Sequence, residues 1–253
     1  MTGMKHGDFT RLAGHYVKYR PAYAPLVRDA IVRLLPARAR AADVGAGTGI
    51  WSKMLLEAGC LVEAVEPNEA MRQAGRAANP EITWVEGSAE DTALPAGGYD
   101  LVSMASSFHW PDFDRAVLEF KRLLKPGGFF AALWNPRDVA GQPLLEDFEA
   151  RIRELVPNLK RVSSGNSEFT ATLTARLEKC GVFAEVIYLE GGHVEEQSPE
   201  RYLGLWESVN DIRVQAGEEK FKLFLDYVRE KTSGLEHIKA RYKTRAWLAR
   251  RAD

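Results

Sequence analysis

The chain has 253 residues, of which 45% are hydrophobic and 27% are charged, and this composition predicts a folded globular protein rather than a disordered chain. Its 34 Lys and Arg residues nearly balance its 35 Asp and Glu residues, which leaves a formal net charge of -1 at pH 7. Because no net field would attract nucleic acid or an anionic membrane, we expect neither of these as a partner.

The first predicted element is a helix at residues 26–35, where apolar residues recur at helical spacing until residues 36–40 interrupt the pattern. Short apolar runs, typical of buried strands, follow at residues 41–44, 61–65, 82–85, 99–104 and 129–134. Between them, apolar faces at residues 51–58 and 113–124 indicate helices. Strands that alternate with helices of this length predict a mostly parallel sheet with helices on both faces.

After residue 134 this regular alternation ends. Apolar patterns predict helices at residues 144–156, 171–180, 199–209 and 218–230. Two further strands are expected at residues 182–189 and 242–249. Since no internal repeat or low-complexity linker divides the chain, we expect residues 1–253 to form one domain. The predicted fold class is α/β, with a doubly wound, mostly parallel, seven-stranded Rossmann-like sheet and helical insertions.

The most informative segment is AADVGAGTG at residues 41–49, in which a predicted strand enters a glycine-rich turn that leads into a helix. Glycine lets the backbone approach a ligand closely, and a helix N-terminus presents free amide groups to an anionic group. Asp43 argues against a dinucleotide, because its carboxylate would repel a pyrophosphate, whereas it suits a ligand that carries ammonium and sulfonium groups. Position 50 is also Ile, where the dinucleotide fingerprint requires Gly.

Polar residues follow the other predicted strands as well. Glu66 lies about 20 residues beyond the first glycine, the offset of an acidic residue that accepts hydrogen bonds from ribose hydroxyls. Residues 86–90 form a polar turn that suits an adenine ring, and residues 106–110 follow the fourth strand, where the reacting groups would meet. Such sheets bind ligands at the carboxyl ends of their strands, so we expect these segments to share one site.

Together these motifs resemble the class I S-adenosylmethionine-dependent methyltransferases, particularly the small-molecule branch called methyltransferase type 11, which includes trans-aconitate methyltransferase-like proteins. The resemblance covers residues 39–135 and rests on DVGAGTG at 43–49, VEP at 65–67, GSAE at 87–90, YDLV at 99–102, FHW at 108–110 and LKPGG at 124–128. It implies S-adenosylmethionine as the cofactor. It also implies that Gly45 and Gly47 line the methionine portion, Glu66 the ribose hydroxyls, and Ala89 with Glu90 the adenine.

The predicted site has a cofactor part and an acceptor part. The predicted cofactor residues are Tyr16, Arg20, Asp43, Gly45, Ala46, Gly47, Glu66, Pro67, Ser88, Ala89, Glu90 and Ser106. Arg20 either pairs with the methionine carboxylate or only positions the first helix on the sheet. Trp110, Trp134 and Asn135 are the predicted acceptor contacts. His109 is the candidate catalytic residue, as a general base, and the alternative is a shape role beside Trp110.

The remaining segments are assigned from their position around this site. Residues 1–36 are expected to provide N-terminal entry and lid helices, residues 39–135 the cofactor-binding half, and residues 137–238 acceptor-side insertions that form a substrate lid. Five further candidates for acceptor contacts are His15, Tyr23, His193, Trp206 and Arg213.

The predicted function is in-line transfer of a methyl group from S-adenosylmethionine to a small organic metabolite. The alternatives are a non-methylating S-adenosylmethionine-binding protein and a nicotinamide-dependent oxidoreductase. We expect no metal, because the sequence has no His and carboxylate cluster at ligand spacing. Cys60 and Cys180 are too few for a disulfide framework, and no apolar stretch is long enough to cross a membrane, so we expect a cytoplasmic protein.

Overall fold

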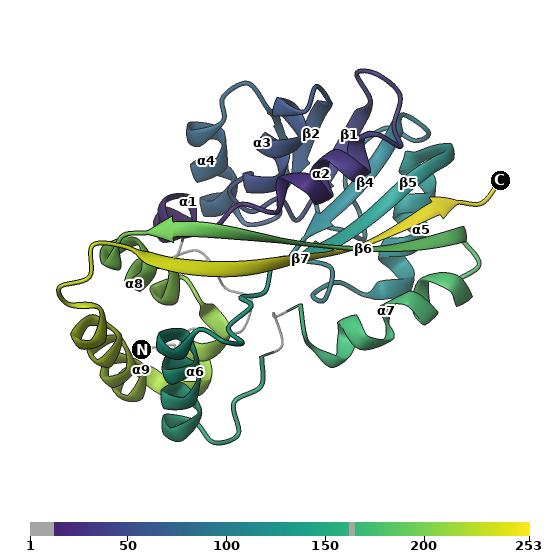
Figure 1. The fold of residues 1–253 in the computed structure, drawn as a ribbon. Helices are drawn as coiled ribbons and strands as arrows, with labels where there is room; N and C mark the ends of the chain where they lie inside the picture. The colour runs from purple at the N-terminus through teal and green to yellow at the C-terminus, as the bar shows by residue number, and fades with distance from the viewer. Residues whose placement is uncertain (1–12, 162–164) are drawn as a thin grey trace.

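A seven-stranded sheet forms the centre of the computed structural model, which describes residues 13–161 and 165–253 (Figure 1). The strands are β1 (Arg40–Val44), β2 (Leu61–Val65), β3 (Thr83–Val85), β4 (Tyr99–Ala105), β5 (Leu124–Trp134), β6 (Phe183–Gln197) and β7 (Ile238–Arg251). Their order is β3-β2-β1-β4-β5-β7-β6. The first five strands run parallel, whereas β7 is antiparallel to β5 and to β6. The predicted α/β class and the mostly parallel seven-stranded sheet are therefore confirmed.

Helices cover both faces of this sheet and extend beyond it. They are α1 (Ala13–Tyr19), α2 (Pro25–Val32), α3 (Ile50–Glu57), α4 (Glu69–Ala78), α5 (Phe113–Leu123), α6 (Pro143–Leu155), α7 (Glu168–Lys179), α8 (Pro199–Glu207) and α9 (Asn210–Thr232). One hydrophobic cluster packs α5 and α7 against the sheet, and a second packs α2 and α3 against the opposite face. No helix in the described part of the chain is long and apolar enough to cross a membrane.

The parallel strands are buried on both faces, which explains their sequences. In β1, Ala42 and Val44 belong to the α5 side, while Ala41 belongs to the α2 side. Successive side chains of a strand point to opposite faces, so a strand covered on both sides has apolar or small residues at nearly every position. This is why the sequence predicts β1 to β4 within one or two residues.

A third hydrophobic cluster lies outside the main sheet and forms a separate layer. It packs α6, α8 and α9 against Ile238, Ala240 and Tyr242 in the first half of β7. Among the strands, this half of β7 pairs with β6, because the pairing of β5 with β7 ends at Trp134 and Arg245; the segment after β5 adds an isolated bridge from Arg137 to Tyr242. The strands predicted at 182–189 and 242–249 were therefore too short. β6 and β7 continue beyond the main sheet as a two-stranded extension, in which buried and more exposed side chains of β7 alternate.

Two helices differ from the sequence prediction for local reasons. The predicted helix at 218–230 is the second half of α9, which bends at Gly217, where φ is +72°. Helix α4 was not predicted, although Asn68 caps its N-terminus by accepting a hydrogen bond from the backbone N–H of Met71. The first twelve residues of the predicted entry segment lie outside the described residues.

Candidate active site

The turn after β1 brings the backbone close to neighbouring side chains. Gly45 and Gly47 have φ angles of +64° and +60°, in the left-handed region that favours glycine. A Cβ atom at Gly45 would lie 2.8 Å from Oγ of Ser107, which follows β4. A side chain at position 45 would therefore clash with Ser107, so the close approach of the turn to the segment after β4 requires glycine.

Glu66 follows β2 and supports the same turn. Its Oε2 atom accepts a hydrogen bond from the backbone N–H of Gly47 at 2.8 Å, and its Oε1 atom accepts one from Asn68 at 2.9 Å. Burial raises the pKa of Glu66, and these two backbone hydrogen bonds oppose that shift. The carboxylate is thus fixed beside the glycine turn and shielded from bulk water.

Asp43 lies behind the turn, on β1, and is fully buried. Oγ of Ser52 donates a hydrogen bond to its Oδ2 atom at 2.5 Å, and Oγ of Ser103 donates one to Oδ1 at 3.1 Å. Burial raises the pKa of Asp43 to about 7, against the lowering effect of these hydroxyls. The structure shows the carboxylate of Asp43 hydrogen-bonded to Ser52 and Ser103. A direct contact between Asp43 and the ligand therefore stays a prediction.

A polar turn follows β3 at the same edge of the sheet. Oγ of Ser88 accepts hydrogen bonds from the backbone N–H groups of Glu90 and Asp91, both at 3.3 Å. The Oε1 atom of Glu90 accepts one from the backbone N–H of Asp112 at 2.9 Å. The turn at residues 88–90 is thus held in one conformation, and it is connected to the start of α5.

The end of β4 contains a strained residue at the centre of the site. Ser106 has a φ angle of +58°, which is uncommon for a residue with a side chain. Its backbone N–H donates to the carbonyl of Leu133 at 2.7 Å, and its Oγ atom lies 2.9 Å from Oη of Tyr23. Strain of this kind is usually found at functional sites, where the surrounding structure maintains it.

These segments enclose a cavity of about 360 Å³, which we call the glycine-turn cavity. Every predicted cofactor residue except Asp43 lines it, so the structure brings together Tyr16, Arg20, Gly45, Ala46, Gly47, Glu66, Pro67, Ser88, Ala89, Glu90 and Ser106. Its lining also includes residues that the sequence analysis did not select for it, namely Tyr23, Thr48, Ile50, Trp51, Asn68, Met71, Met104, Ala105, Ser107 and Pro111. Most of these are direct neighbours of motif positions.

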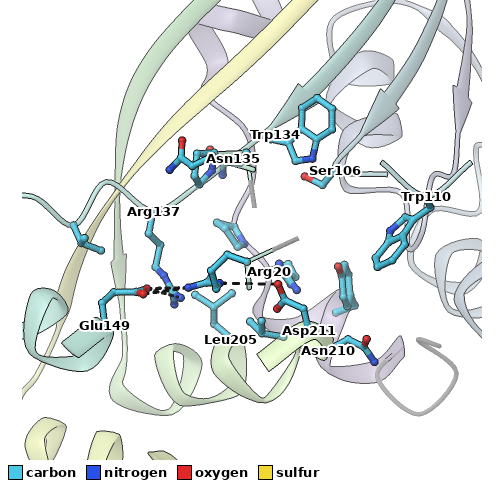
Figure 2. A pocket seen from close by; sticks show the side chains of 18 of the residues that line it. Arg20, Ser106, Trp110, Trp134, Asn135, Arg137, Glu149, Leu205, Asn210 and Asp211 are labelled. Atoms are coloured by element: carbon cyan, nitrogen blue, oxygen red, sulfur yellow. Dashed lines mark hydrogen bonds and ion pairs between the residues drawn. The ribbon is translucent and has the colours of Figure 1, made fainter. Parts of the chain in front are cut away.

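A second cavity of about 360 Å³, the arginine cavity, adjoins the first (Figure 2). It contains Arg20, Arg137, Arg153 and Arg161 together with Glu149 and Asp211. The residues that line both cavities are Tyr16, Arg20, Pro21, Ser106, Trp110 and Asn135. We call these six residues the shared wall. Of the predicted acceptor contacts, Trp110 and Asn135 belong to the shared wall, and Trp134 lines only the arginine cavity.

Arg137 is the most restrained of these arginines. Its backbone bridges to Tyr242 of β7, and its guanidinium lies 3.6 Å from the ring centre of Trp206. Its Nη2 atom donates a hydrogen bond to Oε1 of Glu149 at 3.3 Å. Arg161 also donates to Glu149, at 3.1 Å. The burial of Glu149 would raise its pKa, but these arginines hold it below its usual value.

His109 lies beside the shared wall but lines neither cavity. Its ring centre is 4.4 Å from that of Trp110 and 6.2 Å from that of Trp134. Both ring nitrogens are buried, and neither has a hydrogen-bond partner among the described residues. Burial lowers the pKa of His109 to about 4, although Asp211 opposes this shift. His109 is therefore neutral at pH 7, and its role as general base stays a prediction.

The other candidate acceptor contacts have different positions. Tyr23 lines the glycine-turn cavity. Trp206 lines neither cavity, and its ring packs against the guanidinium of Arg137. His193 stacks on Tyr242, outside both linings. Arg213 pairs with Glu218 at 2.9 Å and lines neither cavity. The side chain of His15 lies outside the described part of the chain. Among the described residues, no group of three or more His, Cys, Asp or Glu side chains could hold a metal ion.

Comparison with known proteins identifies the family. A family model described as a methyltransferase domain matches residues 42–132. The ubiquinone/menaquinone biosynthesis C-methyltransferase of Methylobacterium nodulans is 31% identical over 173 residues, which are 62% of this chain and 68% of that protein. This chain belongs to the class I S-adenosylmethionine-dependent methyltransferases.

Other methyltransferases match over different lengths. An uncharacterized methyltransferase of Mycobacterium bovis is 42% identical over 132 residues, and the match covers 52% of this chain and 53% of that protein. The chain thus spans about half the length of this curated relative. A solved structure from Anaeromyxobacter dehalogenans, provisionally assigned as a type II methyltransferase, has a TM-score of 0.70 at 25% identity over 92% of this chain and 98% of that one. The class I methyltransferase fold therefore extends over nearly the whole chain.

The sequence analysis did not select several residues of the arginine cavity. Arg137 stands two positions after the predicted Asn135, so its place after β5 was a usable signal. Glu149, Arg161 and Asp211 gave no such signal, because they come from α6, from the segment after it and from α9. Only the packing of the third hydrophobic cluster brings them to one cavity.

Proposed function

We propose that this chain transfers a methyl group from S-adenosylmethionine, bound in the glycine-turn cavity, to a small organic acceptor in the arginine cavity. The observation that carries this proposal is the shared wall, because ligands in the two cavities would meet there. Transfer between two bound molecules requires such adjacent positions. Each cavity, at about 360 Å³, suits a small molecule rather than a polymer.

The residues of the glycine-turn cavity fit the cofactor. Gly45 lines the cavity at a position where a Cβ atom would clash with Ser107, so its backbone stays open to the ligand. Each carboxylate oxygen of Glu66 accepts one backbone hydrogen bond and keeps a second acceptor site, which suits the two ribose hydroxyls. We assign the turn of Ser88 to Glu90 to the adenine. We assign the methionine carboxylate to Arg20, whose Nη2 atom donates to the neutral carbonyl of Ser208.

When bound, the cofactor supplies a methyl group on a positively charged sulfur, which is already activated for displacement. The chain therefore has to align the acceptor and exclude water. Trp110 and Asn135 of the shared wall are placed to orient the acceptor. Because His109 lines neither cavity, we assign to it the positioning of Trp110, 4.4 Å away between ring centres.

The rest of the chain is assigned from this arrangement. Residues 39–135 provide the cofactor-binding half, and residues 137–238 provide the acceptor side and its lid. The described part of residues 1–36 closes both cavities through Tyr16 and Arg20. Cys60 and Cys180 are free thiols, as in proteins of a reducing compartment, so we assign the chain to the cytoplasm.

The first experiment compares the binding of S-adenosylmethionine, S-adenosylhomocysteine, NAD and NADP by calorimetry. We expect binding of the two adenosyl sulfur compounds and no binding of the nicotinamides. Mass spectrometry of a metabolite panel incubated with S-adenosylmethionine then tests methyl transfer. Binding of a nicotinamide alone would contradict the cofactor assignment. Binding of the adenosyl compounds with no methylated product across the panel would favour a non-methylating protein.

A further inference from the structure

The lining of the arginine cavity includes residues with hydrogen-bond donors that no atom of the described residues satisfies. Nη1 of Arg137 and Nε1 of Trp134 are buried with no hydrogen-bond partner among the described residues, and both residues line this cavity. A buried donor without a partner costs free energy, so such donors favour a ligand that can accept hydrogen bonds.

Arg137 is held in place before any ligand binds. Its side chain is only 8% exposed, its guanidinium lies on Trp206, and Glu149 accepts from one end of its fork. The planar fork of a restrained arginine loses little conformational freedom when it binds a carboxylate or a phosphate. Because its free end is shielded from bulk water, a charged hydrogen bond formed there is strengthened.

The charges of the described lining also favour an anion. Apart from Arg20, which is assigned to the cofactor, three arginines line the cavity together with two carboxylates. Glu149 bonds both Arg137 and Arg161, and Nε of Arg161 lies 4.0 Å from Oδ2 of Asp211. The lining therefore carries more positive than negative charge, and an anionic ligand would reduce this excess.

The position of Arg137 indicates how the acceptor is oriented in the arginine cavity. Arg137 lines only the arginine cavity, whereas Ser106 and Trp110 of the shared wall line both cavities. Figure 2 shows Arg137 on one side of the arginine cavity and Trp110 on the other. We infer that the acceptor is a small organic anion whose carboxylate or phosphate binds Arg137, while the atom that receives the methyl group lies at the shared wall. The anionic group is thus a recognition group that stays unmethylated. This inference rests on the proposed function.

The test measures binding to protein saturated with S-adenosylhomocysteine. Matched pairs of probes are benzoate with benzamide and cinnamate with cinnamamide, and phenyl phosphate distinguishes phosphate from carboxylate as the preferred group. We expect each acid to bind at least about tenfold more tightly than its amide, as a charged hydrogen bond predicts. In Arg137→Gln this preference disappears. The control Arg151→Gln changes an arginine of α6 that pairs with Glu154 and lines neither cavity, and it keeps the preference.

Each outcome bears on one part of the reasoning. Equal affinity of acids and amides, or no binding of any acid, would overturn the inference. An equal loss in the Arg151 variant would also overturn it, because the effect would then come from the general field. Arg137 does not line the glycine-turn cavity, so retained S-adenosylhomocysteine binding shows that a variant is folded. If Arg137→Gln does not fold, Arg137→Lys keeps the charge without the fork and gives a smaller loss in the same direction. Failure of the wild type to bind S-adenosylhomocysteine would overturn the proposed function and this inference with it.

Discussion

Replacing Glu66 with Gln tests how the glycine turn and the proposed ribose site depend on one carboxylate. In the wild type, the two oxygens accept from the backbone N–H groups of Gly47 and Asn68 at 2.8 and 2.9 Å. A glutamine side chain keeps one acceptor oxygen and places an NH₂ group against the other backbone N–H. Two donors then face each other, whichever way the amide is turned.

The expected size of the effect follows from these contacts. A hydrogen bond to a charged group contributes about 1.5–3 kcal/mol, so losing one backbone acceptor lowers the free energy of unfolding by about 2 kcal/mol. For a domain of this size, that lowers the melting temperature by roughly 4–8 °C. Losing a charged hydrogen bond to a ribose hydroxyl weakens S-adenosylhomocysteine binding by about tenfold to a hundredfold.

Calorimetry with S-adenosylhomocysteine and thermal unfolding measure the two effects separately. The matched control is Glu86→Gln, because the Glu86 side chain is 76% exposed, pairs with Arg72 and does not line the glycine-turn cavity. We expect this control to bind like the wild type. Unchanged affinity in the Glu66 variant would remove Glu66 from the ribose site and refute the reasoning above.

Two more predictions concern the pKa values of Asp43 and His109, and a third concerns the glycine turn. Burial raises the pKa of Asp43 to about 7, so the contribution of Asp43 to stability is complete below about pH 4 and is lost as the pH rises to 7. Over this range, the free energy of unfolding of Asp43→Asn rises relative to that of the wild type by up to about 1.4 kcal/mol per pH unit. Burial lowers the pKa of His109 to about 4, so the contribution of His109 to stability is lost as the pH falls from 6.5 to 4. The free energy of unfolding of His109→Gln therefore exceeds that of the wild type most at low pH, and this difference shrinks with the same slope as the pH rises from 4 to 6.5. Urea unfolding at several pH values measures both differences, and differences independent of pH would contradict them. Gly45→Ala adds a Cβ atom 2.8 Å from Ser107 at positive φ, so we expect calorimetry to show weaker S-adenosylhomocysteine binding. The control is Gly59→Ala, which is also at positive φ but has no atom within 4 Å of the added Cβ, and it should bind like the wild type.

The sequence by itself determined the sheet and the glycine-turn cavity. Strands buried on both faces require apolar residues at nearly every position, and the turn after β1 requires glycine at positive φ, so both features are visible in short segments. Glu66 was found from its spacing to that turn, since parallel strands end at the same edge of the sheet. The position of Asp43 was only partly visible, because its spacing does not reveal the hydroxyls of Ser52 and Ser103.

Only the tertiary structure decided the arginine cavity. Arg137, Glu149, Arg161 and Asp211 come from separate segments that the third hydrophobic cluster brings together, and each appears in the sequence as an ordinary surface charge. Whether such a charge becomes buried and paired depends on the packing of α6, α8 and α9 against the extension of β7. Local sequence patterns predict helices, strands and turns. Whether a charged side chain becomes buried depends on how distant segments of the chain pack together.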